Sequence, residues 1–143
     1  MSRVYFTDRD LGKQFPRILA EAGLRVERHA DLFAPDGSDE QWLEHCGRQG
    51  HVALTHNSRI RYVPNELAAV KRFKVALIIV VGKAPVAELA HNFVRTLSRV
   101  EAIVDAYAPP LIVKVYRASP AELAQAPESP GRAEVWFPVP VGR

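Results

Sequence analysis

Residues 75–100 have the sequence VALIIVVGKAPVAELAHNFVRTLSRV, in which two different periodicities follow each other. Residues 75–81 are all apolar and mostly β-branched, which is typical of a strand that is buried on both faces of a parallel sheet. Pro85 suits the start of a helix, and beyond it apolar residues recur every three or four positions as far as Val100. The stretch therefore predicts a buried strand followed by an amphipathic helix.

The same alternation of strand and helix extends outward from residues 75–100 in both directions. Further strands are predicted at residues 4–7, 24–28, 51–55 and 111–115. Further helices are predicted at residues 11–22, from 38 to Gly47 or Gly50, and at 64–73. Ser38 and Gln41 match a capping box. This order predicts an α/β fold, a three-layer α/β/α sandwich with a mainly parallel sheet of about five strands.

The length of 143 residues suits one globular domain, because 48% of the residues are hydrophobic and 24% are charged. We expect this domain at residues 1–117, then a Pro/Ala-rich linker at 118–132. The apolar tail at 135–141 is expected to dock along its own or a partner subunit, which makes a homodimer an option. No apolar run approaches the roughly 20 residues of a membrane span. We therefore expect no membrane association. Because Cys46 is the single cysteine, we expect a reducing cytoplasm.

Charge is distributed unevenly along the chain. Residues 1–44 carry 6 Lys/Arg and 9 Asp/Glu, whereas residues 45–117 carry 11 Lys/Arg and 4 Asp/Glu. An acidic first third beside a basic middle indicates a site that combines carboxylates with charge that attracts phosphate. An uneven solvated surface is the alternative interpretation.

Acidic and polar residues follow three predicted strands, at the edge where open parallel sheets bind ligands. Asp8 and Asp10 follow the first strand, Asp31 the second, and Asn57 the strand at 51–55, while Asp39 opens a helix. Oxygen ligands that converge from separate strand ends suit Mg²⁺ or Mn²⁺. Two of the acids have other interpretations. Asp10 caps the following helix in the interpretation that we favour, and Asp39 complements a helix dipole.

Four segments carry a family resemblance: FTDRDLG at 6–12, HADLF at 29–33, DEQWL at 39–43 and VALTHNSRIRY at 52–62. Together they resemble a PIN-like domain of the VapC toxin-related family, over about residues 3–117. The resemblance implies an α/β/α sandwich that cleaves RNA with an acidic cluster and Mg²⁺ or Mn²⁺, leaving a 5′-phosphate and a 3′-hydroxyl. It also implies a toxin that pairs with a cognate antitoxin protein.

The resemblance assigns the candidate site residues one by one. Asp8 lies at the family's first metal-binding aspartate, and Asp39 at the aspartate that opens a helix. Asn57 lies at the last acidic position, where the family more often has Asp, and is expected to reach the metal through a water. The second acidic residue of longer PIN domains has no clear counterpart, and Asp31 is the stand-in. Asp8, Asp39 and Asn57 are thus the predicted catalytic and metal-binding residues.

Basic residues follow Asn57 closely. Arg59 and Arg61 are predicted to bind RNA phosphates at the rim of the acidic cluster. Alternatively they are solvated or pair with Glu66. Tyr62 offers a surface for stacking a base, although packing is the favoured interpretation.

Two other function classes stay open. The first is a catalytically weak PIN-like module that binds RNA or a partner protein without cutting, because Asn57 replaces an acid. The second is a receiver-like signalling domain, which also carries acids after its first strand, although Asn57 cannot accept a phosphoryl group.

Zinc and thiol chemistry are disfavoured. The chain has no paired-cysteine motif, and the spacing of His45, Cys46, His51 and His56 matches no common zinc site. Cys46 shares a predicted helix face with Trp42 and Leu43, which indicates an inert core thiol.

Overall fold

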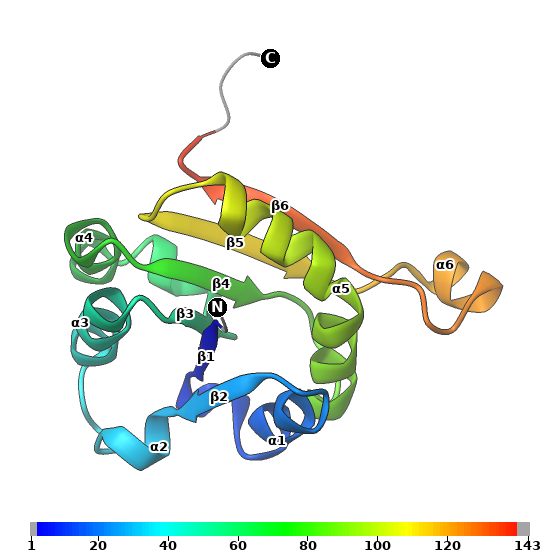
Figure 1. The fold of residues 1–143 in the computed structure, drawn as a ribbon, viewed down its shortest axis with the longest axis horizontal. Coiled ribbons are helices and arrows are strands. Elements are labelled where there is room, and N and C mark those ends of the chain that lie inside the picture. The colour runs from blue at the N-terminus through cyan, green and yellow to red at the C-terminus, as the bar shows by residue number, and fades with distance from the viewer. Residues whose placement is uncertain (1–2, 140–143) are drawn as a thin grey trace.

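A computed structural model of the protein describes residues 3–139, and the fold is a six-stranded sheet covered by helices on both faces (Figure 1). The strand order is β2-β1-β3-β4-β5-β6, in which the first five strands are parallel and β6 runs antiparallel to β5. The strands are β1 (Val4–Thr7), β2 (Arg25–Arg28), β3 (Val52–Thr55), β4 (Ala76–Val80), β5 (Leu111–Tyr116) and β6 (Arg132–Phe137). The predicted α/β sandwich is confirmed, with a sixth strand.

The helices divide between the two faces of this sheet. They are α1 (Gln14–Glu21), α2 (His29–Leu32), α3 (Asp39–Gln49), α4 (Pro64–Phe73), α5 (Val86–Ala106) and α6 (Pro120–Gln125), with 3-10 turns η1 (Arg9–Leu11) and η2 (Ser58–Arg61). Helices α1 and α5 pack together on one face, and α3 and α4 on the other (Figure 1). No helix within residues 3–139 is long and apolar enough to cross a membrane.

Strand β1 shows how the sequence builds two cores. Tyr5 points to the α1/α5 face and contacts Phe93 of α5, whereas Phe6 points to the α3/α4 face and stacks on Trp42 at 5.4 Å between ring centroids. This alternation follows from the two-residue period of a strand. Both faces of the central strands are therefore apolar, and polar side chains are left to the strand ends.

The segment at 75–100 folds as predicted. Every residue of β4 is buried, and Pro85 caps α5, whose stripe Leu89, Ala90, Phe93 and Val100 is buried against the sheet. Gly50 ends α3 in the left-handed conformation, with φ of 70°.

The capping box predicted at Ser38 is wrong. Ser38 occupies the N-cap position of α3, but its side chain makes no capping hydrogen bond. The Gln41 side chain lies over Gly37 instead, where an added Cβ would come within 2.6 Å of Gln41 Oε1. A capping box does form at Ser119 and Glu122, where it starts α6.

Residues 118–139 contain regular structure. Helix α6 is followed by Gly131, whose N–H donates to the Thr96 hydroxyl at 2.8 Å, and then by β6 along β5. The tail therefore docks on its own sheet as an edge strand, with Trp136 and Phe137 packed against the α3/α4 core. Residues 140 and 141 of the predicted tail lie outside the described residues.

Candidate active site

Asp8 is the buried centre of the polar cluster at the carboxyl end of β1. Its side chain is only 5% exposed. Oδ1 accepts a hydrogen bond from the Arg9 N–H at 2.7 Å, and Oδ2 accepts one from the Thr55 hydroxyl at 2.8 Å. The carboxylate thus joins the ends of two neighbouring strands, β1 and β3.

Asp10 does not cap the first helix, so the interpretation favoured from the sequence is wrong. Asp8 is the N-cap of η1, and Asp10 reaches across to β3, where its carboxylate accepts from the His56 N–H at 3.2 Å and lies 3.3 Å from the Thr55 hydroxyl. The 3-10 turn is the cause, because it begins at Arg9, directly after Asp8. Asp10 therefore belongs to the acidic cluster.

Burial and, after it, the nearby negative charge of Asp10 raise the pKa of Asp8 to about 6. The hydrogen bonds from Thr55 and Arg9 act in the opposite direction, because they stabilise the carboxylate. Their effect is smaller than that of burial. Asp8 is consequently a carboxylate that two hydrogen bonds hold in place and whose charged form is disfavoured by burial.

A second pair of carboxylates lies where helices α3 and α4 begin. Asp39 opens α3 and accepts from Trp42 Nε1 at 2.9 Å, and Glu66 lies in the first turn of α4. The pKa of Glu66 is raised to about 7, first by burial and then by its interaction with the Asp39 carboxyl group, with further contributions from the charges of Glu40 and Asp8. Glu66 Oε1 is buried and has no hydrogen-bond partner among residues 3–139.

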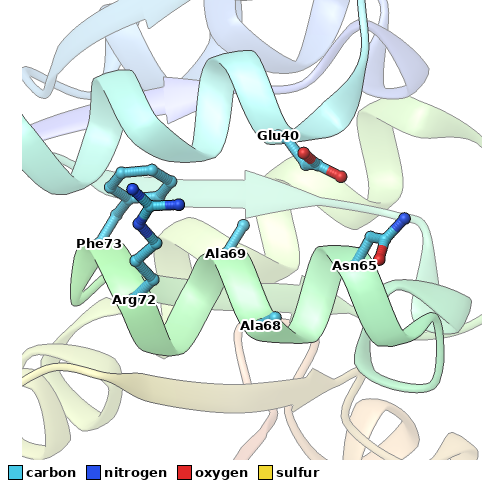
Figure 2. A pocket seen from close by; sticks show the side chains of 6 residues that line it. All are labelled: Glu40, Asn65, Ala68, Ala69, Arg72 and Phe73. Atoms are coloured by element: carbon cyan, nitrogen blue, oxygen red, sulfur yellow. The ribbon is translucent and has the colours of Figure 1, made fainter.

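The two helices begin side by side. Figure 2 shows Glu40 of α3 and Asn65 of α4 at the same end of a groove that runs between the helices. The groove holds about 350 Å³, and Arg72 and Phe73 line its other end. Because the helix starts carry partial positive charge, acidic side chains there are favoured individually even though they repel one another.

Asn57 has a local structural role. Its Oδ1 accepts from the Arg59 N–H at 3.1 Å and caps η2, while its own N–H donates to the Thr55 hydroxyl at 3.1 Å. Thr55 therefore contacts Asp8, Asp10 and Asn57 at once. A carbonyl oxygen has two lone pairs, so Oδ1 keeps capacity for one more hydrogen bond.

Asp31 lies in α2, and its exposed carboxylate pairs with Arg28 at 2.8 Å and 3.0 Å. No hydrogen bond in the described part of the chain joins it to Asp8 or Asp39. Its role as a metal ligand stays a prediction.

A small cavity of about 220 Å³ opens beside Asp8. Three cationic residues, Arg9, Lys13 and Arg28, line it together with Asp8 and the buried His29. Positive charge is therefore concentrated next to the buried carboxylate, as a phosphate-binding site requires.

The predicted RNA-binding residues, Arg59 and Arg61, lie in η2, which directly follows Asn57. Arg59 is exposed, whereas the guanidinium of Arg61 lies 4.7 Å from the centre of the Tyr62 ring and 5.4 Å from that of Trp136. Tyr62 is 65% exposed and meets Trp136 edge to face at 5.9 Å. Trp136 of β6 thus joins a cluster that the prediction confined to residues 59–62.

The acidic cluster fits a hydrated divalent cation. Mg²⁺ keeps several waters and uses one or two carboxylates, so it does not require a compact set of protein ligands. Within residues 3–139, the acids at this edge do not bring three ligand atoms within 4.8 Å of one another. Burial and neighbouring carboxylates raise the pKa values of Asp8 and Glu66, and Glu66 Oε1 has no hydrogen-bond partner among residues 3–139.

Residues 3–82 match the family model described as PIN like domain, and the chain belongs to this family. Members of this class are generally nucleases that use divalent metals. No curated protein and no solved structure matches the chain. The matched segment contains all the residues of the acidic cluster, Asp8, Asp10, Asp39 and Glu66.

Glu66 lies in the acidic cluster but is not among the residues predicted for the site. The sequence suggests it only as a partner of Arg59 and Arg61. The available signal was its place in the first turn of a helix that starts at Pro64, directly after the polar residues that follow β3. Such a position brings a carboxylate back to the edge where Asp8 lies.

Proposed function

We propose that this protein is a metal-dependent ribonuclease that hydrolyses RNA phosphodiester bonds. The observation that supports it best is the crowding of Asp8, Asp10, Asp39 and Glu66 at one edge of the sheet, where the pKa values of two carboxylates are raised. Like charges in a partly buried place call for a cation. In this proposal Asp8 and Asp39 hold Mg²⁺ or Mn²⁺, and Asn57 hydrogen-bonds one of its waters.

The bound ion would supply Lewis-acid stabilisation of the negative charge on the scissile phosphate. The residues of the chain have separate tasks. Thr55 fixes the orientation of Asp8 and Asn57 through its hydrogen bonds. Glu66 would hold or release a proton near neutral pH beside Asp39, because its pKa is raised to about 7.

The sheet order supports a track for the RNA backbone. Arg28 ends β2, Asp8 follows β1 and Asn57 follows β3, and these strands are neighbours in the order β2-β1-β3. Adjacent strands are about 4.8 Å apart, so the track spans about 10 Å, close to the length of one or two nucleotides. Arg9, Lys13 and Arg28 would bind phosphate at one end, and Arg59 at the other.

Tyr62 suits a base at the far end of this track. Tyr62 is largely exposed, while Arg61 and Trp136 pack against its ring. Aromatic stacking accepts any base once the strand is single, so the proposed substrate is single-stranded RNA. In this arrangement Arg61 contributes to phosphate binding and also holds the aromatic pair.

We further propose that the ribonuclease acts as a toxin that is held inactive by a cognate antitoxin protein. The resemblance of residues 6–12, 29–33, 39–43 and 52–62 to VapC-related domains supports this step. A homodimer through the outer edge of β6 stays part of the proposal.

Cleavage of single-stranded RNA in a manganese series, with a chelator control, tests the enzyme. Wild-type protein should cut only with the ion, and Asp8→Asn should remove the activity. Asp36→Asn is the matched control, because Asp36 is an exposed turn residue outside the acidic cluster. If wild-type protein binds RNA but never cleaves it at any manganese concentration, the non-catalytic RNA-binding module replaces the nuclease as the preferred function.

A further inference from the structure

A second group of potential metal ligands lies away from the acidic cluster. Glu27 of β2, His45 of α3 and His51, which precedes β3, place one ligand atom each within 4.8 Å of one another. Glu27 Oε1 lies 2.8 Å from His45 Nε2 and 3.1 Å from His51 Nδ1. We propose that these three residues form a binding site for Zn²⁺ or a similar transition-metal ion.

The distances between the ligand atoms are close to those of a zinc site. Zinc bonds to nitrogen and oxygen are about 2.0 to 2.1 Å, so two ligands of a tetrahedral ion lie about 3.3 Å apart. Two of the three ligand pairs are already at 2.8 and 3.1 Å. Small side-chain movements would therefore admit the ion without a change of backbone.

The kind of donor also favours zinc. Two imidazoles and one carboxylate are a donor set that zinc uses with water in the fourth position, whereas Mg²⁺ prefers oxygen ligands alone. The side chains of Glu27, His45 and His51 are 24%, 25% and 17% exposed, so solvent can reach that position. The site is thus open on one side, as a three-ligand zinc site requires.

The surrounding residues hold the ligands in place. Phe6 and Phe33 contact the His45 ring at centroid distances of 6.2 and 5.6 Å, and the His45 and His51 rings meet at 5.7 Å. The Cys46 thiol is fully buried, and its sulfur is not among the ligand atoms that lie within 4.8 Å of one another. Cys46 therefore does not join the donor set.

This site is independent of the proposed nuclease site. His45 lies six residues after Asp39 on α3, which corresponds to about 9 Å along the helix axis. The sequence alone does not indicate zinc here, because the spacing of the histidines matches no common motif. The third ligand, Glu27, comes from β2, so no motif within one segment of the sequence contains all three ligands. An ion there would join β2, α3 and the start of β3, and would stabilise the folded chain.

The test uses Zn²⁺ alone on the untagged full chain. Equilibrium dialysis with metal analysis should give one tightly bound zinc per chain, and zinc should raise the melting temperature by roughly 5 °C or more. Glu27→Gln and His51→Gln should each weaken zinc binding by roughly tenfold or more. His91→Gln is the matched control, because His91 is exposed on α5, and Asp8→Asn should also leave this zinc in place.

A different outcome would overturn the proposal. Zinc binding that persists unchanged in Glu27→Gln and His51→Gln, or that disappears in Asp8→Asn, would place the ion elsewhere. Cobalt provides a second measurement on the wild-type chain that does not depend on the folding of variants. Tetrahedral bands without a sulfur charge-transfer band support the site, whereas a sulfur band would assign the ion to Cys46. Absence of any binding would leave Glu27 as an acceptor of two imidazole hydrogen bonds.

Discussion

Helix α3 has contrasting polar surroundings along its length. At its start, Asp39 faces Glu66 and the negative charge of Asp8, and no hydrogen bond within residues 3–139 satisfies Glu66 Oε1. Six residues later, His45 and its neighbour His51 both meet the carboxylate of Glu27. The first group is short of positive charge, while the second is internally satisfied. In the two proposals, the crowded carboxylates bind a hydrated hard cation, whereas the mixed group binds a transition metal.

The strongest test of this comparison removes one ligand from each site in turn and measures both properties in each variant. Asp39→Asn should lower manganese-dependent RNA cleavage by about a hundredfold or more, because it removes a proposed ligand, and should leave zinc binding unchanged. His45→Gln should do the reverse. Cleavage rates and zinc dialysis on both variants measure it. If either variant lost both properties while its circular dichroism stayed native, the two sites would not be separate.

The acidic group should also make stability fall as pH rises. The pKa of Asp8 is raised from 3.8 to about 6 in the folded chain, so between these values the folded state binds more protons than the unfolded state. Unfolding free energy therefore falls across this window by about 3 kcal/mol for Asp8 alone. Glu66 extends the fall towards pH 7. Denaturant titrations of metal-free protein at pH 4, 5, 6 and 7 measure the slope.

Two additions isolate the cause of that slope. Asp8→Asn should flatten the pH dependence and stabilise the metal-free chain at pH 7, because the amide carries no charge to desolvate. Saturating Mn²⁺ should restore stability to the wild-type chain at pH 7. A wild-type chain whose stability rises steadily from pH 4 to 7 without metal would contradict the raised pKa of Asp8.

Substitutions of Tyr62 test whether RNA binds beside the acidic cluster. Tyr62→Ala should weaken binding of single-stranded RNA by about 1 to 3 kcal/mol, the range for one stacked base. Tyr62→Phe is the matched control, because it keeps the ring and should bind almost as wild type does. Fluorescence anisotropy with a short RNA measures both variants. Equal affinity of the Ala variant and wild type would limit Tyr62 to packing against Trp136.

Asn57→Asp should give the smallest effect. A carboxylate at this position adds one negative charge to the cluster, so manganese affinity should rise by several-fold, about 1 kcal/mol, and cleavage at limiting metal should rise with it. Titration calorimetry measures the affinity. Asp also caps a turn well, so η2 should be retained. Unchanged affinity would mean that Asn57 acts only as the cap of η2.

The sequence predicted most of the fold because periodicity is a local property. Residues 75–100 carry both periods in full, and β4 and α5 appear where expected. Strand β6 was predicted only as part of a docked tail, because Pro138 and Pro140 follow it closely and its hydrogen bonds come from β5, which is distant in sequence.

The site was less accessible to sequence than the fold. Asp8 and Asp39 were predicted from their positions after a strand and at a helix start, and their role as metal ligands stays a prediction. Asp10 was assigned to a cap because the sequence does not distinguish a 3-10 turn from a helix start. Glu66 and Glu27 depend on which helices and strands lie side by side, and a single sequence does not show this.

The contact between Tyr5 and Phe93 shows that the segment that identifies the family is shorter than the segment that the fold requires. The family match ends at residue 82, yet the Tyr5 ring packs edge to face on Phe93, and its hydroxyl donates to Glu101 at 2.8 Å. Helix α5 covers the apolar face of the central strands that residues 3–82 would leave open to water. A fragment cut at the end of the family match would keep every acidic cluster residue and still be expected to aggregate. A fragment intended for expression should therefore include α5 and the later strands, and should not end at residue 82.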